Sequence, residues 1–198
     1  MLELAAGPAD HAREFARRGI PATALDLSAA MCASARTRAT GLPLQVVQAD
    51  MTDFDLPHRF DLALLMLDSA ALLLTDEAMT GFLTRTAEHL APAGLLIVDL
   101  AAPAGADPDW TIGDVRTRWG SPQDVHDQVT GIRQVRVRIS VAHETVVDTI
   151  IPARPWTAAE LTRLTSLEPI ARYGSMTADL PATDPRAHRE ILILRRPA

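Results

Sequence analysis

The sequence predicts an α/β fold in which helices cover both faces of a mostly parallel sheet. Apolar runs of strand length alternate with segments of helical period from the first residue onward, which is typical of βαβ units. Two of these runs are almost unbroken, as in strands buried on both faces. The length sets the number of domains, because 198 residues suffice for one α/β domain and are few for two. We therefore expect a single domain over residues 1–198.

The first hundred residues contain five strand signals and three helix signals. The clearest helix is Met79–Leu90, whose apolar residues recur every three or four positions; Thr75 or Asp76 would cap it, and Pro92-Ala93-Gly94 would end it. The other helices are expected over 9–18 and, after Ser28 as N-cap, up to residue 38. The strands are expected at Met1–Ala5, Thr23–Asp26, Leu44–Ala49, Asp61–Leu67 and Leu95–Leu100.

After the fifth strand the pattern becomes antiparallel. Residues 101–109 are rich in Ala, Pro, Gly and Asp and are expected to form a loop. Short turns separate three further strand signals, so we predict a three-stranded antiparallel insert over 101–152. These strands are Thr111–Trp119, Gly131–Val141 and Glu144–Ile151.

Valines alternate with Arg136 and Arg138 in the insert, which gives it one basic face. This face either binds an anionic substrate or is the solvated side of a sheet. Parallel packing resumes at Thr157, which forms a Thr-x-x-Glu capping box with Glu160 for a helix up to residue 167. Two last strands, Ile170–Tyr173 and Glu190–Arg195, complete a seven-stranded sheet.

The composition excludes several classes of function. A net charge of −6 argues against tight binding of nucleic acid, which favours a basic surface. The single cysteine, Cys32, cannot form an internal disulfide and is interpreted as a core residue, and no histidine pair has zinc-like spacing. There is no apolar run of transmembrane length and no signal-peptide pattern, so we expect a cytoplasmic protein. Because the cysteine and the histidines lack the spacing of metal ligands, we expect no metal site.

The candidate site residues follow the strands, because ligands of open α/β sheets bind beyond the carboxyl ends of the strands. A small-residue turn around Gly7 follows the first strand and allows a ligand close to the backbone. Asp26 ends the second strand, where it could accept both hydroxyls of a ribose. Asp50 and Met51 follow the third strand and would suit an adenine amine and ring. Together these positions predict a nucleoside pocket, although each aspartate also fits a turn or a helix cap.

Two residues distinguish S-adenosylmethionine (SAM) from a dinucleotide. Pro8 removes a backbone donor, and Asp10 places a carboxylate at the helix N-terminus where a pyrophosphate would bind. A carboxylate there repels an anion but tolerates a sulfonium and an ammonium. A nicotinamide-dependent dehydrogenase, which would use the same Asp26, stays as an alternative.

These segments resemble successive motifs of the class I SAM-dependent methyltransferases of small-molecule type. The resemblance rests on four stretches that run from the first strand to the fifth, and the insert is similar to that of sugar-amine N-methyltransferases. It implies a Rossmann-like, doubly wound sheet and a cofactor site. The four stretches are Glu3-Leu4-Ala5-Ala6-Gly7-Pro8-Ala9, Ala24-Leu25-Asp26-Leu27-Ser28 with Met31, Ala49-Asp50-Met51 and 60–100.

The resemblance also implies roles for individual residues. Residues matching the first motif would line the methionine part of SAM, those matching the second would hold the ribose, and those matching the third the adenine. Leu67, at the end of the fourth strand, completes the expected cofactor site. By motif, the set is Glu3, Ala5 and Gly7; Asp26, Leu27 and Met31; Asp50 and Met51; and Leu67.

The chain departs from the family pattern in two places. Ala5 and Ala9 stand where the glycine-rich loop usually has its first and last glycines, and the first strand begins at Met1, where family members usually carry further helices upstream. For the second departure we expect either that the true start lies upstream or that this is a truncated form without those helices. A non-catalytic SAM-binding fragment is therefore a second alternative.

Methyl transfer needs a positioned nucleophile more than a fixed catalytic residue. The expected reaction is in-line transfer of a methyl group from SAM to a nitrogen or oxygen of a small molecule. No catalytic residue is assigned beyond Asp68, which could orient the acceptor, accept its proton or merely cap a loop.

His11 could reach the cofactor carboxylate or lie partly exposed on its helix. Trp110, Trp119 and Trp156 flank the insert, where such residues are more often core or interface anchors than substrate walls. A homodimer through the insert is expected.

Overall fold

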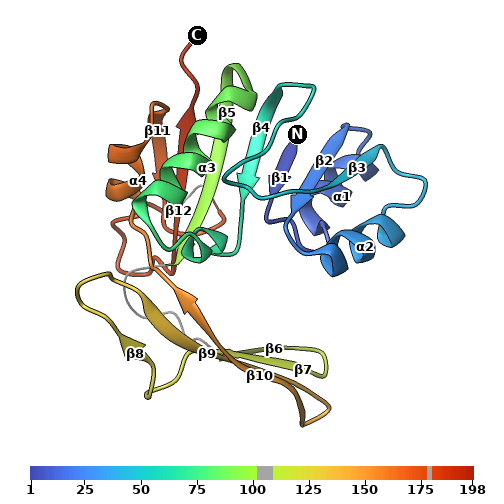
Figure 1. The fold of residues 1–198 in the computed structure, drawn as a ribbon. Coiled ribbons are helices and arrows are strands. Elements are labelled where there is room, and N and C mark those ends of the chain that lie inside the picture. The colour runs from blue at the N-terminus through green and yellow to red at the C-terminus, as the bar shows by residue number, and fades with distance from the viewer. Residues whose placement is uncertain (102–108, 178–179) are drawn as a thin grey trace.

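The computed structural model describes residues 1–101, 109–177 and 180–198, and its main feature is a seven-stranded sheet (Figure 1). The strand order is β11-β12-β5-β4-β1-β2-β3. Neighbouring strands from β3 to β5 pair in parallel, and β12 is antiparallel to both of its neighbours, β5 and β11. The predicted Rossmann-like, mostly parallel sheet is confirmed. Its strands are β1 (Leu2–Leu4), β2 (Ala22–Asp26), β3 (Leu44–Gln48), β4 (Phe60–Leu65), β5 (Leu90–Ala101), β11 (Glu168–Tyr173) and β12 (Arg189–Arg195).

Three of the helices, α2, α3 and α4, begin where the sequence places their caps. The side chains of Ser28, Thr75 and Thr157 accept hydrogen bonds from the backbone of the first turn, and Glu160 completes the capping box with Thr157. Such a cap stabilises a helix by about 1 kcal/mol. The helices are α1 (Asp10–Arg17), α2 (Ala29–Arg38), α3 (Asp76–His89) and α4 (Ala158–Leu164), with a 3-10 helix, η1 (Ser69–Leu72), before α3.

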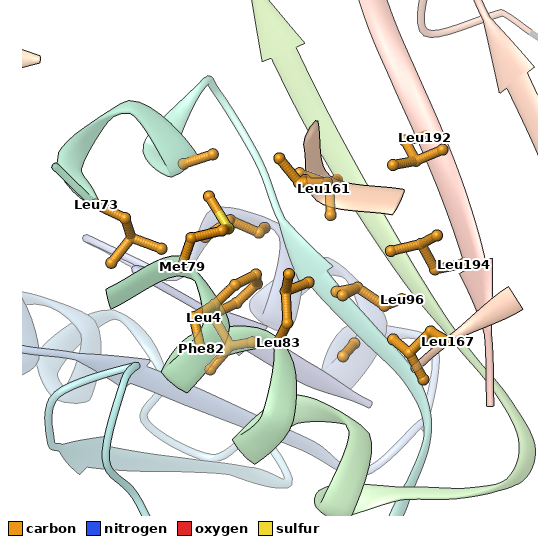
Figure 2. Packing of buried hydrophobic residues seen from close by; sticks show 14 of the residues in the cluster. Leu4, Leu73, Met79, Phe82, Leu83, Leu96, Leu161, Leu167, Leu192 and Leu194 are labelled. Carbon is orange, nitrogen blue, oxygen red and sulfur yellow. The ribbon is translucent and has the colours of Figure 1, made fainter. Parts of the chain in front are cut away.

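Alternate residues of the strands feed two separate cores, one on each face of the sheet. On one face, Leu2 and Leu4 of β1 pack with leucines of β5 and β12 beneath α3 and α4 (Figure 2). On the other face, small alanines of β2 pack against alanines of α1 and α2. The first core contains the largest buried side chains, such as Phe82 and Met79 of α3. Helices therefore cover both faces, as a doubly wound sheet requires.

Gly94 lies within β5, where neighbouring backbone leaves no room for a side chain. A Cβ atom at this position would lie 2.8 Å from the carbonyl oxygen of Ala91 and 2.9 Å from that of Phe60, closer than real side chains approach. Only glycine fits there. The helix ends at His89, before the predicted break, and residues 92–94 lie within β5. The strand is longer than predicted, since Leu90 already pairs with Phe60 of β4.

The insert forms a second, antiparallel sheet that lies apart from the main one (Figure 1). It has more strands than the three predicted, because Gly113 adopts φ +62° and divides Thr111–Trp119 into a hairpin. A two-residue strand also pairs with β9. Most of the loop predicted over 101–109 and the side chain of Trp110 lie outside the described residues. The strands are β6 (Asp109–Ile112), β7 (Val115–Trp119), β8 (Val125–His126), β9 (Arg133–Val141) and β10 (Glu144–Ala153).

The insert is joined to the main domain next to the carboxyl ends of β4 and β5. Val135 of β9 packs with Ala153 of β10 against Ala71 of η1. The amide of Arg154 also donates to the carbonyl of Ala71 over 2.9 Å.

In the part of the chain that the structure describes, no helix has the length and apolarity to cross a membrane.

Candidate functional site

The loop after β1 adopts an unusual backbone conformation. Ala5, Gly7 and Ala9 have φ values of 48°, 53° and 60°, all in the left-handed region. The two alanines therefore occupy positions that favour glycine, at a cost of about 1 kcal/mol each. Beside Gly7 there is open space, since an added Cβ would meet no atom within 4 Å. The loop thus keeps the left-handed conformation of a glycine-rich turn and exposes backbone at its centre.

The carboxylate of Asp26 connects this loop to the end of β2. Its Oδ2 accepts a hydrogen bond from the amide of Gly7 at 2.7 Å, and its Oδ1 accepts one from the amide of Ser28 at 2.8 Å. Each carboxylate oxygen has a second lone pair. Because Asp26 is only partly buried, those lone pairs can still receive hydroxyl donors from a ligand. The structure brings Gly7 and Asp26 together as the sequence predicts.

The ends of β2 and β3 are adjacent. The amide of Ala49 donates to the carbonyl of Asp26 over 3.1 Å. Asp50 is the next residue and therefore lies near the end of β2. The Oδ1 of Asp50 accepts hydrogen bonds from the amide and the hydroxyl of Thr52, both at 2.8 Å. Asp50 thus has the turn role that the sequence offered as the alternative to adenine binding. The turn uses Oδ1 of Asp50 and not Oδ2. Met51 is partly buried against the core under α3.

Two exposed apolar side chains lie at the same strand end. Leu27 is 67% exposed and Met31 is 43% exposed, although both lie beside the well-packed end of β2. The buried thiol of Cys32 lies beneath them and donates to the carbonyl of Asp26. Burial of Cys32 confirms its interpretation as a core residue, while the exposure of Leu27 and Met31 is that expected for a wall open to a ligand.

Glu3 is buried, and each of its carboxylate oxygens has a partner inside the protein. Its Oε2 accepts the amide of Ala12 at 2.7 Å, and its Oε1 lies 2.8 Å from Nδ1 of His11. The hydrogen bond to Glu3 raises the pKa of His11, and desolvation offsets part of this. Glu3 thus attaches α1 to β1 and orients His11, a pairing that the sequence did not reveal. Its predicted contact with the methionine part of SAM stays a prediction.

Leu67 and Asp68 form a tight turn where β4 ends. Both have φ near +57°, at 57° and 56°, which is rare for consecutive residues other than glycine. Leu67 is 73% exposed, whereas Asp68 is partly buried and its Oδ1 accepts the amide of Ala101 at 3.0 Å. Burial raises the pKa of the Asp68 carboxyl above its ordinary value, and the Ala101 amide and Arg189 oppose this. A carboxyl held in this way is a better proton acceptor near neutral pH than an exposed one.

Sequence reasoning missed Asp99 and Arg189, which lie beside this turn. Asp99 is fully buried on β5, and its Oδ1 accepts Nε of Arg189 at 2.7 Å. The available signal was a single charged residue within the apolar run Leu95–Leu100. Asp99 lies inside its strand, whereas the predicted site residues follow the ends of strands.

Other candidates have structural roles. Trp156 is buried, and its Nε1 donates to the carbonyl of Leu73 at 2.8 Å, which confirms it as a core anchor. Arg154 lies over its ring at 3.8 Å from the centroid. Trp119 is 36% exposed on the insert. Asp10 lies in the first turn of α1 and forms an ion pair with Arg13. Among the described residues, no group of three or more His, Cys, Asp and Glu side chains could hold a metal ion.

Comparison with known proteins agrees with this geometry. Residues 1–94 match a family described as a methyltransferase domain. A dTDP-3-amino-3,4,6-trideoxy-alpha-D-glucopyranose N,N-dimethyltransferase of Streptomyces venezuelae is 31% identical over 121 residues, which are 61% of this chain and 50% of that protein. A dTDP-4-amino-2,3,4,6-tetradeoxy-D-glucose N,N-dimethyltransferase of Saccharopolyspora spinosa is 29% identical over 50% of this chain and 39% of that protein. The chain thus spans half or less of the curated relatives it matches.

Solved structures extend the likeness of the fold to the whole chain. A SAM-dependent methyltransferase from Clostridium acetobutylicum has a TM-score of 0.80 at 16% identity and covers 100% of this chain and 83% of its own. An amino pentose methyltransferase from Micromonospora echinaspora, solved with SAM bound, has a TM-score of 0.72 at 20% identity and covers 98% of this chain and 82% of its own. The first 94 residues thus match a methyltransferase domain family, and the chain shares the fold of SAM-dependent methyltransferases over nearly its whole length.

Proposed function

We propose that this protein transfers a methyl group from SAM to the amino group of a small molecule. The observation that carries the proposal is the Asp26 carboxylate, held by the amides of Gly7 and Ser28 at the carboxyl ends of β1 and β2. It lies beside a left-handed loop with open space at Gly7. A ribose would use the outer lone pairs of Asp26, and the exposed side chains of Leu27 and Met31 would cover its apolar surroundings.

When bound, SAM supplies a methyl group on a sulfonium sulfur, which is a good leaving group. The contribution of the protein is to hold the acceptor nitrogen in line with the carbon–sulfur bond, about 3–3.5 Å from the methyl carbon. The nitrogen lone pair forms the new bond, and the carbon–sulfur pair stays on sulfur as a thioether. The nitrogen product is cationic and loses a proton.

Asp68 is the group that we assign to that proton or to orientation of the acceptor ammonium. It lies at the end of β4, one residue beyond the exposed Leu67, and its carboxyl is held by the Ala101 amide. Burial makes this carboxyl more basic than an exposed aspartate. An amine acceptor is protonated at neutral pH, so a nearby base assists its reaction.

The names of the relatives support one class of acceptor. Both curated proteins are named as N,N-dimethyltransferases of dTDP-linked amino sugars, and the matching region of the first covers 61% of this chain. We therefore take a nucleotide-linked amino sugar as the first acceptor to test. An amine is favoured over a hydroxyl because it is the stronger nucleophile once deprotonated.

A homodimer through the insert also belongs to this proposal. Side chains on one face of the insert are apolar and exposed although Val135, on the same face, is buried against η1. A second copy of this chain would cover them. These side chains are Ile112, Val115, Trp119 and Val147.

The proposal predicts SAM-dependent methylation of an amino sugar. Incubation with SAM and a dTDP-linked amino sugar should yield S-adenosylhomocysteine and a sugar one methyl group heavier, measured by liquid chromatography and mass spectrometry. The matched control is the same sugar with a hydroxyl in place of the amine, for which we expect at least a ~10-fold lower rate, because a neutral hydroxyl is a poor nucleophile. Product formation from neither sugar, or from the hydroxyl sugar alone, would contradict the assignment of an amine acceptor.

A further inference from the structure

Asp99 stands out as a charged side chain with no exposed surface at the carboxyl end of β5. Its Oδ1 accepts Nε of Arg189 at 2.7 Å, and Nη2 of Arg189 lies 2.6 Å from the same oxygen. Its Oδ2 accepts the backbone amide of Leu67 at 2.8 Å. A buried carboxylate is retained only where partners offset its desolvation. Here the partners are one arginine from β12 and the backbone that ends β4.

The turn at Leu67 and Asp68 is attached to β5 by three hydrogen bonds. Besides the bond from the Leu67 amide to the Asp99 carboxylate, the amide of Asp68 donates to the Asp99 carbonyl at 3.1 Å. In return, the amide of Ala101 donates to the Asp68 carboxylate at 3.0 Å. Two consecutive left-handed residues are an unfavourable conformation that persists only where surrounding contacts determine it. These three bonds supply such contacts.

We propose that Asp99 and Arg189 are positioning residues that hold the Leu67–Asp68 turn and fix the Asp68 carboxyl in the proposed methyl-transfer site. This inference rests on the proposed function for the role of Asp68. Arg189 holds one oxygen of Asp99, which leaves the other aimed at the Leu67 amide. Asp99 in turn fixes both amides of the turn, and the turn places the Asp68 side chain against Ala101 of β5.

The two charges of the pair act on Asp68 in opposite directions. The positive charge of Arg189 lowers the pKa of Asp68, and the negative charge of Asp99 raises it, on top of the increase caused by burial. Across the β1 end, Asp99 also raises the pKa of His11, which Glu3 holds. Within residues 1–101, 109–177 and 180–198, the charged partner of both Asp68 and Asp99 is Arg189 on β12, and Asp99 also acts on His11 of α1, which Glu3 of β1 holds.

This opposition gives a test that loss of stability cannot imitate. Asp99→Asn removes the charge that raises the pKa of Asp68, so the acidic limb of the pH profile of kcat/KM should move to lower pH. Arg189→Gln removes the charge that lowers it, so the same limb should move to higher pH. We also expect kcat to fall about 10–100-fold in Asp99→Asn, since a displaced turn misplaces the acceptor. Asp68→Asn should abolish the limb.

The matched control is Glu190→Gln. Glu190 follows Arg189 on β12, is also buried, and forms an ion pair with Arg172 while accepting the amide of Ala158 from α4. Its substitution removes a buried paired carboxylate from the opposite face of the same strand. We expect Glu190→Gln to lower the melting temperature and to leave the acidic limb where it is in the unmodified protein.

A second measurement does not depend on catalysis. Titration of the Asp68 carboxyl carbon by NMR, assigned by its loss in Asp68→Asn, should show the same opposite shifts in the two variants. Opposite shifts in a protein that transfers no methyl group would support the positioning pair and count against the proposed function. Methyl transfer with shifts that are absent or in one direction would overturn the pair and leave the proposed function intact. If Asp99→Asn does not fold, Arg189→Gln and its rescue by Arg189→Lys carry the test.

Discussion

Replacing Asp26 with alanine is expected to weaken the binding of S-adenosylhomocysteine at least 10-fold. The substitution removes charged hydrogen bonds to the ribose, each contributing about 1.5–3 kcal/mol, and about 1.4 kcal/mol corresponds to a factor of ten. It also removes the acceptor for the amides of Gly7 and Ser28, so the loop after β1 loses its attachment to β2. Isothermal titration calorimetry on the folded variant measures the change.

Two controls separate the direct contact from the effect on the loop. Asp114→Ala makes the same change of charge at an exposed turn of the insert and should leave the dissociation constant unchanged. A 2′-deoxy analogue of S-adenosylhomocysteine should bind the unmodified protein about 10-fold more weakly than the parent compound, but should bind Asp26→Ala as well as the parent does. An Asp26→Ala protein that is folded and binds with unchanged affinity would remove Asp26 from the site.

Among the substitutions proposed, Phe82→Ala is expected to cause the largest decrease in the free energy of unfolding. Phe82 is fully buried on α3, where it packs with Met79 and Leu83 over the leucines of the sheet (Figure 2). Truncation of a buried phenylalanine costs about 3–5 kcal/mol, through lost burial and the cavity it leaves. For a chain of this size that corresponds to a decrease of roughly 6–20 °C in the melting temperature.

The control for this substitution lies two positions further along α3. Thr84 is exposed on the same helix, and Thr84→Ala should change the free energy of unfolding by no more than about 0.5 kcal/mol. Urea unfolding followed by circular dichroism gives both values. A loss below about 1 kcal/mol in Phe82→Ala would mean that α3 does not pack on the sheet as described, since the cost of such truncations exceeds that value.

The order of strands and helices could be predicted because the apolar residues of this chain recur with the periods of strands and helices. Unbroken apolar runs marked β4 and β5, and the caps at Ser28 and Thr157 marked the starts of α2 and α4. The insert was predicted with too few strands because alternation continues across Gly113, where a left-handed turn reverses the chain. A single glycine within an alternating segment does not reveal whether the strand bends or folds back.

The candidate site was predicted in part, and the limits have a physical cause. Asp26 and Gly7 each follow or end a predicted strand, and the structure joins them by a hydrogen bond. This could be predicted because parallel strands bring their carboxyl ends to one edge of the sheet. The partners of Glu3 and Asp99 could not be predicted, since these contacts join residues from different strands and helices whose side-chain directions depend on the packed fold. The left-handed turn at Leu67 and Asp68 likewise arises from hydrogen bonds to β5 and not from local residue preference.

The carboxyl ends of β1, β2 and β3 are expected to bind SAM and not a dinucleotide. The most direct test titrates the unmodified protein with S-adenosylhomocysteine and, separately, with NADH in the same calorimeter. Our account predicts saturable binding of S-adenosylhomocysteine with one site per chain and no heat of binding for NADH at the same concentration. Saturable binding of NADH without binding of S-adenosylhomocysteine would contradict it, since Asp26 would then hold the ribose of a nicotinamide cofactor.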